Sequence, residues 1–287
     1  MLFNACGSER RCCCKGDFDE VADGQEPPSM LQDERAFQPH AVLNNEPFGR
    51  GKKMGGDSLE ERPETVVEGG AKYVGQWKGT MRHGYGIITQ PDGSRYEGMF
   101  YEGQAHGEGK FVAANGNRYE GQWLYNRAHG DGTYNHNDGS TYKGQFSEDE
   151  KSGKGVERWA DGCTYEGDFH FGCKHGHGIY RSSNNSVVVY DGQFHNDKME
   201  GEGTYRFADG RVYKGQWVSG QMHGEGRMDW SNGSRYVGHF EKNLRHGTGN
   251  FTWPDGRVFQ GKWIHGKQEA TPNGHAEAPP AELAPKT

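Results

Sequence analysis

The sequence predicts an all-β fold, an elongated single-layer antiparallel sheet of about nine tandem β-hairpins. The 287 residues include 47 glycines but only 31% hydrophobic residues, which are too few apolar side chains to fill a conventional globular interior. Aromatic residues, at 12%, are too plentiful for a wholly disordered chain. A pattern of glycine and aromatic residues also recurs at a fixed spacing, and such periodicity is typical of repeat architectures.

Each repeat begins with the pattern aromatic-x-Gly-x-aromatic, which occurs nine times. Successive first aromatic residues are 23 residues apart seven times and 25 apart once, with the two extra residues falling in 182–189. The two aromatic positions of the nine copies form the predicted core, which consists of Tyr73, Trp77, Tyr96, Phe100, Tyr119, Trp123, Tyr142, Phe146, Tyr165, Phe169, Tyr190, Phe194, Tyr213, Trp217, Tyr236, Phe240, Phe259 and Trp263.

The spacing within one repeat predicts a two-stranded hairpin. Alternate residues of a strand share one face, so both aromatic side chains lie on one side and the glycine between them leaves room for a neighbouring side chain. After about six polar residues, Gly-x-Gly opens a second short strand, at residues 110–113 in the second copy. Asn115-Gly116 and the equivalent Asp-Gly pairs then turn the chain, since both residue types tolerate a positive φ. One hairpin cannot bury its rings alone, so stability depends on neighbours stacked in register.

These residues carry a family resemblance. Tyr-Glu-Gly-Gln-Trp, His-Gly-x-Gly and Asp-Gly, repeated every 23 residues over 72–267, resemble the MORN (membrane occupation and recognition nexus) repeat. The resemblance implies an extended β-hairpin array. MORN arrays occur in proteins that join membranes, phosphatidylinositol phosphate kinases, histone methyltransferases, ciliary radial spokes and protist cytoskeletal scaffolds, so the family alone does not select a function. Neither flank of the array is long enough to hold a catalytic domain, and we predict no enzymatic activity and no cofactor.

Composition divides the chain into four parts: a cysteine-rich segment (1–15), a disordered acidic linker containing prolines (16–70), the array (71–267) and a disordered Ala/Pro-rich tail (268–287). The array contains 24 Lys and Arg against 23 Asp and Glu, whereas the linker contains 5 against 13. A nearly neutral array lacks the basic surface that nucleic acid requires, so we predict no nucleic-acid binding. For the same reason, we place binding of anionic phospholipid by the repeats second to another mode of membrane attachment.

That other mode is suggested by the extreme N-terminus, where four of the six cysteines lie beside Arg10, Arg11 and Lys15. The cluster resembles an S-acylation site, because acyl chains on adjacent thiols together with nearby cations supply the two signals that stable anchoring needs. Leu2 stands where N-myristoylation requires glycine. The alternatives are exposed thiols without this role, or a metal site, for which three consecutive cysteines are poorly spaced. The predicted lipidation residues are Cys6, Cys12, Cys13 and Cys14.

Histidines and glycines offer two further candidate sites. Repeats in register separate equivalent side chains by roughly 10 Å, too far for one metal ion, so histidines before Gly-x-Gly are expected to be structural. Cys173-x-His175-x-His177 is a local metal candidate, but alternate side chains of a strand are about 7 Å apart, and we predict no metal site. No helical period follows any Gly-x-Gly, so these are not phosphate-binding loops. The six histidines concerned are His83, His106, His129, His175, His223 and His246.

The sequence therefore predicts a non-enzymatic scaffold or adaptor. No window contains the roughly 18 apolar residues of a membrane-spanning helix, and the N-terminus lacks the apolar run of a secretory signal. We expect a cytosolic protein, peripheral on the cytoplasmic face of a membrane at the cell cortex, with cytoskeletal or other protein partners. Resemblance to cytoskeletal MORN proteins implies a homodimer. The alternatives are an axonemal subunit of the radial-spoke type, located in the cilium, and a phospholipid-binding regulator of a phosphatidylinositol phosphate kinase.

Overall fold

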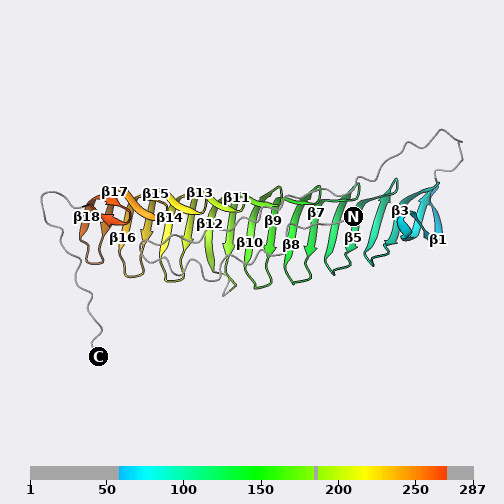
Figure 1. The fold of residues 1–287 in the computed structure, drawn as a ribbon, viewed down its shortest axis with the longest axis horizontal. Coiled ribbons are helices and arrows are strands. Elements are labelled where there is room, and N and C mark those ends of the chain that lie inside the picture. The colour runs from blue at the N-terminus through cyan, green and yellow to red at the C-terminus, as the bar shows by residue number, and fades with distance from the viewer. Residues whose placement is uncertain (1–57, 184–186, 270–287) are drawn as a thin grey trace, which may run out of the picture. The chain divides into compact units, whose positions relative to one another are not determined.

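The computed structural model describes residues 58–183 and 187–269, which fall into two compact units, residues 58–198 and 199–269. Within each unit, antiparallel strands follow one another in chain order (Figure 1). The predicted all-β fold of tandem hairpins is confirmed. The cysteine segment, the linker up to residue 57 and the tail from residue 270 lie outside the described residues.

In the first unit, each hairpin joins a first strand of seven or eight residues to a longer second strand. The first strands are β2 (Lys72–Lys78), β4 (Arg95–Tyr101), β6 (Arg118–Leu124), β8 (Thr141–Ser147), β10 (Thr164–His170) and β12 (Val188–His195). The second strands, of nine residues, are β3 (Met81–Thr89), β5 (Gln104–Val112), β7 (Arg127–Asn135), β9 (Glu150–Arg158) and β11 (Cys173–Arg181).

The second unit continues the same alternation. Its strands are β13 (Lys198–Arg206), β14 (Val212–Val218), β15 (Gln221–Asp229), β16 (Arg235–Glu241), β17 (Leu244–Thr252), β18 (Val258–Ile264) and the two-residue β19 (Lys267–Gln268). At the start of the first unit, β1 (Glu60–Val66) pairs with β2, and a 3-10 turn, η1 (Glu68–Gly70), joins them. The sequence assigned residues 60–70 to a disordered linker; this part was wrong, because backbone pairing with β2 orders a segment that has little apolar patterning.

The short connection inside each hairpin is a two-residue turn. Between β4 and β5, Glu102 and Gly103 have φ values of 48° and 81°, and positive φ at both positions is the signature of the type I′ turns that favour hairpins. The second strand therefore starts at Gln104, earlier than the predicted 110–113. A β-bulge, with Gly107 at φ 66°, lets the strand continue through the Gly-x-Gly element.

The longer connection between repeats is a three-residue loop. After β5, the Ala113 amide donates to the Asn117 carbonyl (2.8 Å) and the Gly116 amide donates to the Ala113 carbonyl (2.9 Å). The predicted turn at Asn115-Gly116 is present, and of the two residues only Gly116 has a positive φ, of 90°. The Asn115 side chain instead accepts a hydrogen bond from the Asn117 amide (3.1 Å), which explains why Asn or Asp precedes the glycine.

The core is a layer of edge-to-face rings. Tyr73 contacts Trp77 of its own repeat with a centroid distance of 5.1 Å and Phe100 of the next repeat at 5.2 Å, and later repeats show the same two contacts within each unit. Seventeen of the eighteen predicted core side chains are buried. Phe259 is only partly buried and contacts the ring of Trp263. No further aromatic pair follows it among the described residues to cover its outer side.

The glycines explain how a tyrosine ring is buried in so thin a structure. Gly98 and Gly109 stand opposite each other on β4 and β5, and the Tyr96 ring lies over this pair. A Cβ atom on Gly109 would lie 2.6 Å from Cε2 of Tyr96, and one on Gly98 would lie 2.5 Å from the Gly109 Cα. The Tyr96 hydroxyl donates to the Met99 carbonyl (2.8 Å). Each repeat's own tyrosine therefore occupies the room that its glycines leave.

Candidate interaction surfaces

The inner face, defined here as the face that carries the tyrosines, has two further positions per repeat that vary in chemistry. They lie nine and fifteen residues after the tyrosine. In the third repeat, from Tyr119, they are Ala128 and Tyr134, both buried. In the fourth repeat, from Tyr142, they are charged. The inner face is thus apolar in one repeat and ionic in the next.

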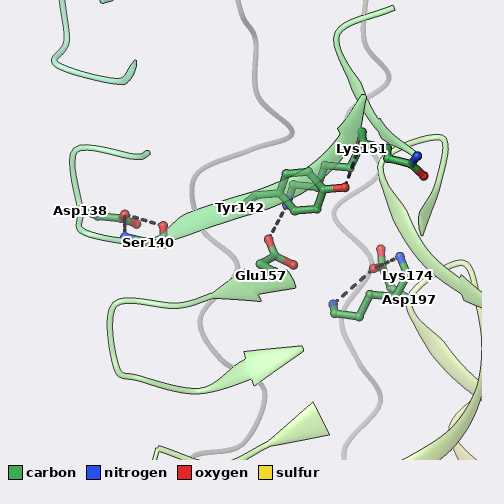
Figure 2. Close-up of polar contacts among 8 residues, drawn as sticks. Asp138, Ser140, Tyr142, Lys151, Glu157, Lys174 and Asp197 are labelled. Carbon is green, nitrogen blue, oxygen red and sulfur yellow. Dashed lines mark hydrogen bonds and ion pairs between the residues drawn. The ribbon is translucent and has the colours of Figure 1, made fainter. Parts of the chain in front are cut away.

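Charged residues at these positions, together with Asp197 from the turn after β12, form what we call the inner ionic cluster, which consists of Lys151, Glu157, Lys174 and Asp197 (Figure 2). Lys151 and Glu157 are ion-paired, with side chains only 21% and 16% exposed. The Lys174 and Asp197 side chains pair at 3.4 Å, and Asp197 also accepts a hydrogen bond from the Lys174 amide (2.9 Å).

Both lysines of the cluster also contact aromatic rings. The Lys151 ammonium lies 5.1 Å from the Tyr142 ring centroid, and that of Lys174 lies 5.2 Å from the Trp159 centroid. A cation over an aromatic face is attracted by the ring quadrupole. The lysines are therefore held jointly by carboxylates and rings, and the aromatic layer continues beneath them.

Partial burial shifts the pKa values of three side chains near the inner ionic cluster. Burial lowers the pKa of His136, with the neighbouring Lys151 cation acting in the same direction. Burial raises the pKa of the Asp149 carboxyl, against the opposing hydrogen bond from the Ala128 amide. Burial also raises the pKa of Tyr142. In each case burial, which disfavours the charged form, is the largest cause.

The inner face of the second unit carries a different arrangement, the aromatic row, defined as Phe207, Trp230 and Trp253. These partly exposed residues occupy equivalent loop positions in successive repeats. An arginine lies over each ring: Arg211 over Phe207 at 4.7 Å, Arg245 over Trp230 at 5.8 Å and Arg257 over Trp253 at 5.3 Å. Sequence reasoning missed this row, although its signal was readable as an aromatic residue two positions before each Asp-Gly or Asn-Gly pair.

On the opposite, outer face, side chains change while the backbone pattern stays constant. The residue twelve positions after the tyrosine is exposed in the first five repeats. In four of these repeats, the backbone amide of this residue donates a hydrogen bond to the side chain three residues after the tyrosine. Examples are the Tyr85 amide to Gln76 (2.9 Å) and the Lys154 amide to Gln145 (3.0 Å). The residues at this position are Tyr85, Glu108, Asp131, Lys154 and His177.

The histidines before Gly-x-Gly line the turn end of the sheet and contact other rings. His106 lies between Tyr101 and Tyr125, with centroid distances of 5.6 and 5.3 Å. His175 lies between His170 (5.4 Å) and His195 (4.9 Å).

Of the Cys173-x-His175-x-His177 candidate, His177 pairs with Asp191 at 2.9 Å while His175 faces the two histidines just described. Across residues 58–183 and 187–269, no group of three or more His, Cys, Asp or Glu side chains is placed to hold a metal ion.

Cys6, Cys12, Cys13 and Cys14 lie outside the described residues, so the structure gives no geometry for the predicted lipidation segment. Within the described part of the chain, no helix combines the length and apolar character needed to cross a membrane.

The strands, turns and ring layer define a tandem β-hairpin repeat protein. Comparison with family models matches the MORN repeat eight times in succession, and the chain belongs to the MORN-repeat family. The matches cover 73–95, 96–118, 119–141, 142–164, 165–187, 190–210, 213–235 and 236–256. The ninth hairpin, from Phe259, lies beyond these matches. As a member of this family, the chain is a repeat scaffold or adaptor.

Other comparisons add little. No curated protein matches the sequence significantly. Among solved structures, the TCP domain of SAS-4 (dCPAP) of Drosophila melanogaster, in complex with a proline-rich motif of Ana2 (dSTIL), is 13% identical with a TM-score of 0.34, covering 68% of this chain and 99% of that one. A mutant TCP10 domain of Danio rerio CPAP is 12% identical with a TM-score of 0.29, covering 70% and 100%. At these TM-scores, neither likeness carries an argument about this chain.

Proposed function

We propose that this protein is a membrane-tethered scaffold: acyl chains on Cys6, Cys12, Cys13 and Cys14 hold it at the cytoplasmic face of a membrane, and the hairpin array presents its outer face to protein partners. The observation that supports the scaffold is the contrast between a constant interior and a variable exterior. The same tyrosine and glycine pair recurs in the repeats, whereas the exposed position twelve residues after the tyrosine is aromatic, acidic, basic or histidine.

Such a division separates folding from recognition. Because each ring is buried by its own repeat and the next, exposed side chains are released from any role in forming the core. Exposed positions away from buried features usually change stability by less than about 0.5 kcal/mol. The outer face therefore varies at little cost, and each repeat offers a partner a different set of groups on one regular backbone.

The tether is supported by the sequence of the N-terminal segment. One acyl chain gives only marginal, reversible membrane binding, and stable anchoring needs a second chain or a basic patch. Four cysteines beside Arg10, Arg11 and Lys15 offer both signals.

The tether is tested by alkyne-palmitate labelling and membrane fractionation of the full chain. We expect labelling and pelleting in the wild type and their loss when the four N-terminal cysteines become serine. The control, Cys163→Ser with Cys173→Ser, replaces the two cysteines of the array and is expected to label and pellet like the wild type. Unchanged labelling and pelleting of the four-cysteine variant would contradict the tether. A ciliary signal that survives detergent and the substitutions would favour the axonemal alternative.

The presenting face is tested by charge reversal. The triple variant Glu108→Lys, Asp131→Lys, Lys154→Glu changes three exposed outer positions and no core contact. We expect proximity labelling in cells to lose part of the partner set, with the thermal unfolding curve unchanged. An identical partner set with an intact fold would show that partners bind elsewhere.

A further inference from the structure

Two of the two-residue turns in the first unit carry bulky aromatic residues in an unfavourable backbone conformation. Tyr125 and Phe171 each occupy the first position of such a turn, with φ values of 48° and 45°. A positive φ is uncommon for any residue other than glycine, and for a bulky side chain it is an outlier. Glycine stands at this position in the first repeat (Gly79) and asparagine in the sixth (Asn196), as such turns favour. Turn chemistry therefore does not explain the two aromatic residues.

Core packing does not explain these two residues either. Tyr125 is 54% exposed and Phe171 is 74% exposed. The ring of Tyr125 contacts that of His106 at 5.3 Å, and the ring of Phe171 contacts that of His170 at 4.2 Å. Strained backbone positions cluster where a protein binds a ligand or switches its state. An exposed apolar ring on a strained turn therefore indicates a contact with another molecule.

Other exposed apolar side chains lie beside Tyr125 at the turn end of the hairpins. Leu124, the preceding residue, is 36% exposed. Tyr101 of the second repeat is 41% exposed and contacts His106 at 5.6 Å, so a row of three rings crosses the second and third repeats. At the opposite end of the first four hairpins, the loops present exposed Asp or Asn residues before their glycines. These exposed rings therefore gather at one end of the hairpins.

The same end carries a net negative charge. The turns of the second to fifth repeats with their flanking residues, 101–104, 124–127, 147–150 and 170–173, contain four acidic residues and one cation. That cation, Arg127, is ion-paired with Glu148 at 2.7 Å, and Glu102 and Glu150 are exposed at neighbouring turns. The cytoplasmic leaflet of a membrane is also anionic. The charge is therefore complementary to a basic protein segment and opposes contact with lipid.

We propose that the turn end of the first unit is a docking surface for a basic protein segment. Apolar side chains of the segment pack on the exposed rings, which are the usual anchors of protein interfaces, and its Lys and Arg side chains meet the carboxylates. Tyr125 and Phe171 are two repeats apart, about 19 Å at 4.8 Å per strand, so one continuous segment contacts both. We call this the turn-tip surface and define it as Tyr101, Glu102, Leu124, Tyr125, Glu150 and Phe171.

This surface is separate from the outer face and from the N-terminal cysteines. Glu108, Asp131 and Lys154, the outer positions changed above, lie within strands β5, β7 and β9, and none of them belongs to a turn. Failure of the tether or of the presenting face therefore leaves the turn-tip proposal standing, and the reverse also holds.

The test selects a ligand without presupposing a partner. A phage library of random dodecapeptides, which span about 40 Å when extended at 3.3 Å per residue, is panned against the full-length chain. Counter-selection uses the double variant Tyr125→Asn, Phe171→Asn, which has the residue of the sixth repeat at both turns. We expect the enriched peptides to combine Lys or Arg with aromatic or aliphatic residues. A selection that yields acidic peptides, or none that prefers the wild type, would overturn the proposal.

The enriched peptide is then labelled with fluorescein and titrated with each variant, with fluorescence anisotropy as the readout. We expect the double variant to bind at least about tenfold more weakly and to melt no lower than the wild type, because asparagine is favoured at this turn position. The matched control, Ser219→Asn with Lys242→Asn, makes the same change at equivalent turns of the second unit and should bind like the wild type. Equal binding by the double variant and the wild type would refute the docking surface.

A charge variant keeps the test decisive if the rings also support the fold. Glu102→Lys with Glu150→Lys leaves every ring in place, and we expect it to bind the peptide at least about tenfold more weakly. If it binds like the wild type, the proposal fails.

Two further measurements address the other occupants. With the four N-terminal cysteines changed to serine, we expect no pelleting with phosphatidylcholine–phosphatidylserine vesicles that depends on Tyr125 and Phe171. We also expect light scattering to give the same mass for the wild type and the double variant. Pelleting that the double variant abolishes would identify a lipid surface as the ligand, and a dimer that it abolishes would identify a second copy of this chain. Either result would replace the basic segment.

Discussion

The third and fourth repeats have the same frame and opposite interiors. In both, a fully buried tyrosine covers a pair of glycines. At the two variable inner positions, the third repeat has Ala128 and Tyr134, and the fourth has the ion pair Lys151 and Glu157. The backbone register is closely similar. The fold is thus set by the tyrosine and its glycines, and it accepts either apolar or ionic groups around them.

The fourth repeat accommodates the Lys151–Glu157 ion pair because of the contacts that both charges make. Two charges taken out of water are costly unless their geometry and neighbours compensate. Here the ammonium of Lys151 meets a carboxylate and also lies over the rings of Tyr142 and Phe169. The same kind of aromatic layer therefore packs against the apolar Ala128 side chain in the third repeat and binds the Lys151 cation in the fourth.

Removing the frame should be the most damaging change, and equally so in both repeats. We expect Tyr119→Ala and Tyr142→Ala each to lower the free energy of unfolding by about 3–5 kcal/mol, the usual cost of truncating a buried ring. Tyr119→Phe, the control, keeps the ring and loses the hydroxyl with its hydrogen bond to the Gln122 carbonyl, at about 1 kcal/mol. Urea titration measures all three. A far smaller loss for Tyr142→Ala than for Tyr119→Ala would show that the ion pair, not the ring, supports the fourth repeat.

Breaking the ion pair should come next in size. Lys151→Ala removes the ammonium from the partly buried Glu157 carboxylate, and we expect a loss of about 2 kcal/mol. The double variant Lys151→Ala, Glu157→Tyr gives the fourth repeat the interior of the third, and should recover most of that loss. The same urea titration compares them. A double variant less stable than the single one would mean that the two interiors are not interchangeable.

The pH dependence near the cluster should be smaller. Burial and Lys151 lower the pKa of His136 in the folded protein, so the unfolded chain, with a histidine pKa of about 6.5, binds the proton first as pH falls. The stability that neutral His136 contributes is therefore present above about pH 6.5 and is lost below it. We expect the melting temperature of His136→Ala, which copies Ala113 of the second repeat, to fall less between pH 7 and pH 5 than that of the wild type. Parallel curves would contradict this assignment.

The smallest effect concerns a turn. Asp149 and Asn126 occupy equivalent turn positions, and each accepts a hydrogen bond from the backbone amide of an alanine, at 2.7 and 2.8 Å. Burial raises the pKa of Asp149, which means that its charged form is disfavoured in the folded state at neutral pH. Asp149→Asn keeps the acceptor and removes the charge, so we expect a gain of about 0.5 kcal/mol at pH 7, shrinking as the pH falls through the folded-state pKa. A loss of stability at pH 7 would show that the charge itself strengthens the bond.

The repeat period and aromatic spacing were enough to predict the hairpins and seventeen buried core residues. The turns were not predictable in the same way, because the two-residue turns contain residues such as Glu102 and Tyr125 that rarely adopt a positive φ. Strand β1 was missed since backbone pairing, and not side-chain pattern, forms it. The inner ionic cluster depends on which residues share a face across repeats, and this requires the bulge at each Gly-x-Gly to be known, whereas the aromatic row was readable from its place two residues before the Asp-Gly and Asn-Gly pairs.

The most direct test of the frame is the stability of Gly132→Ala and Gly155→Ala beside Gly139→Ala. A Cβ atom on Gly132 would lie 2.6 Å from Cε2 of Tyr119, and one on Gly155 would lie 2.7 Å from Cζ of Tyr142. Gly139 has open space around it but a φ of 93°, so alanine there meets backbone strain alone, at about 1 kcal/mol. We predict that both inner substitutions reduce the free energy of unfolding by about 3 kcal/mol, well beyond Gly139→Ala. Inner substitutions no more damaging than Gly139→Ala would contradict the central claim that the tyrosine over its paired glycines holds each repeat together.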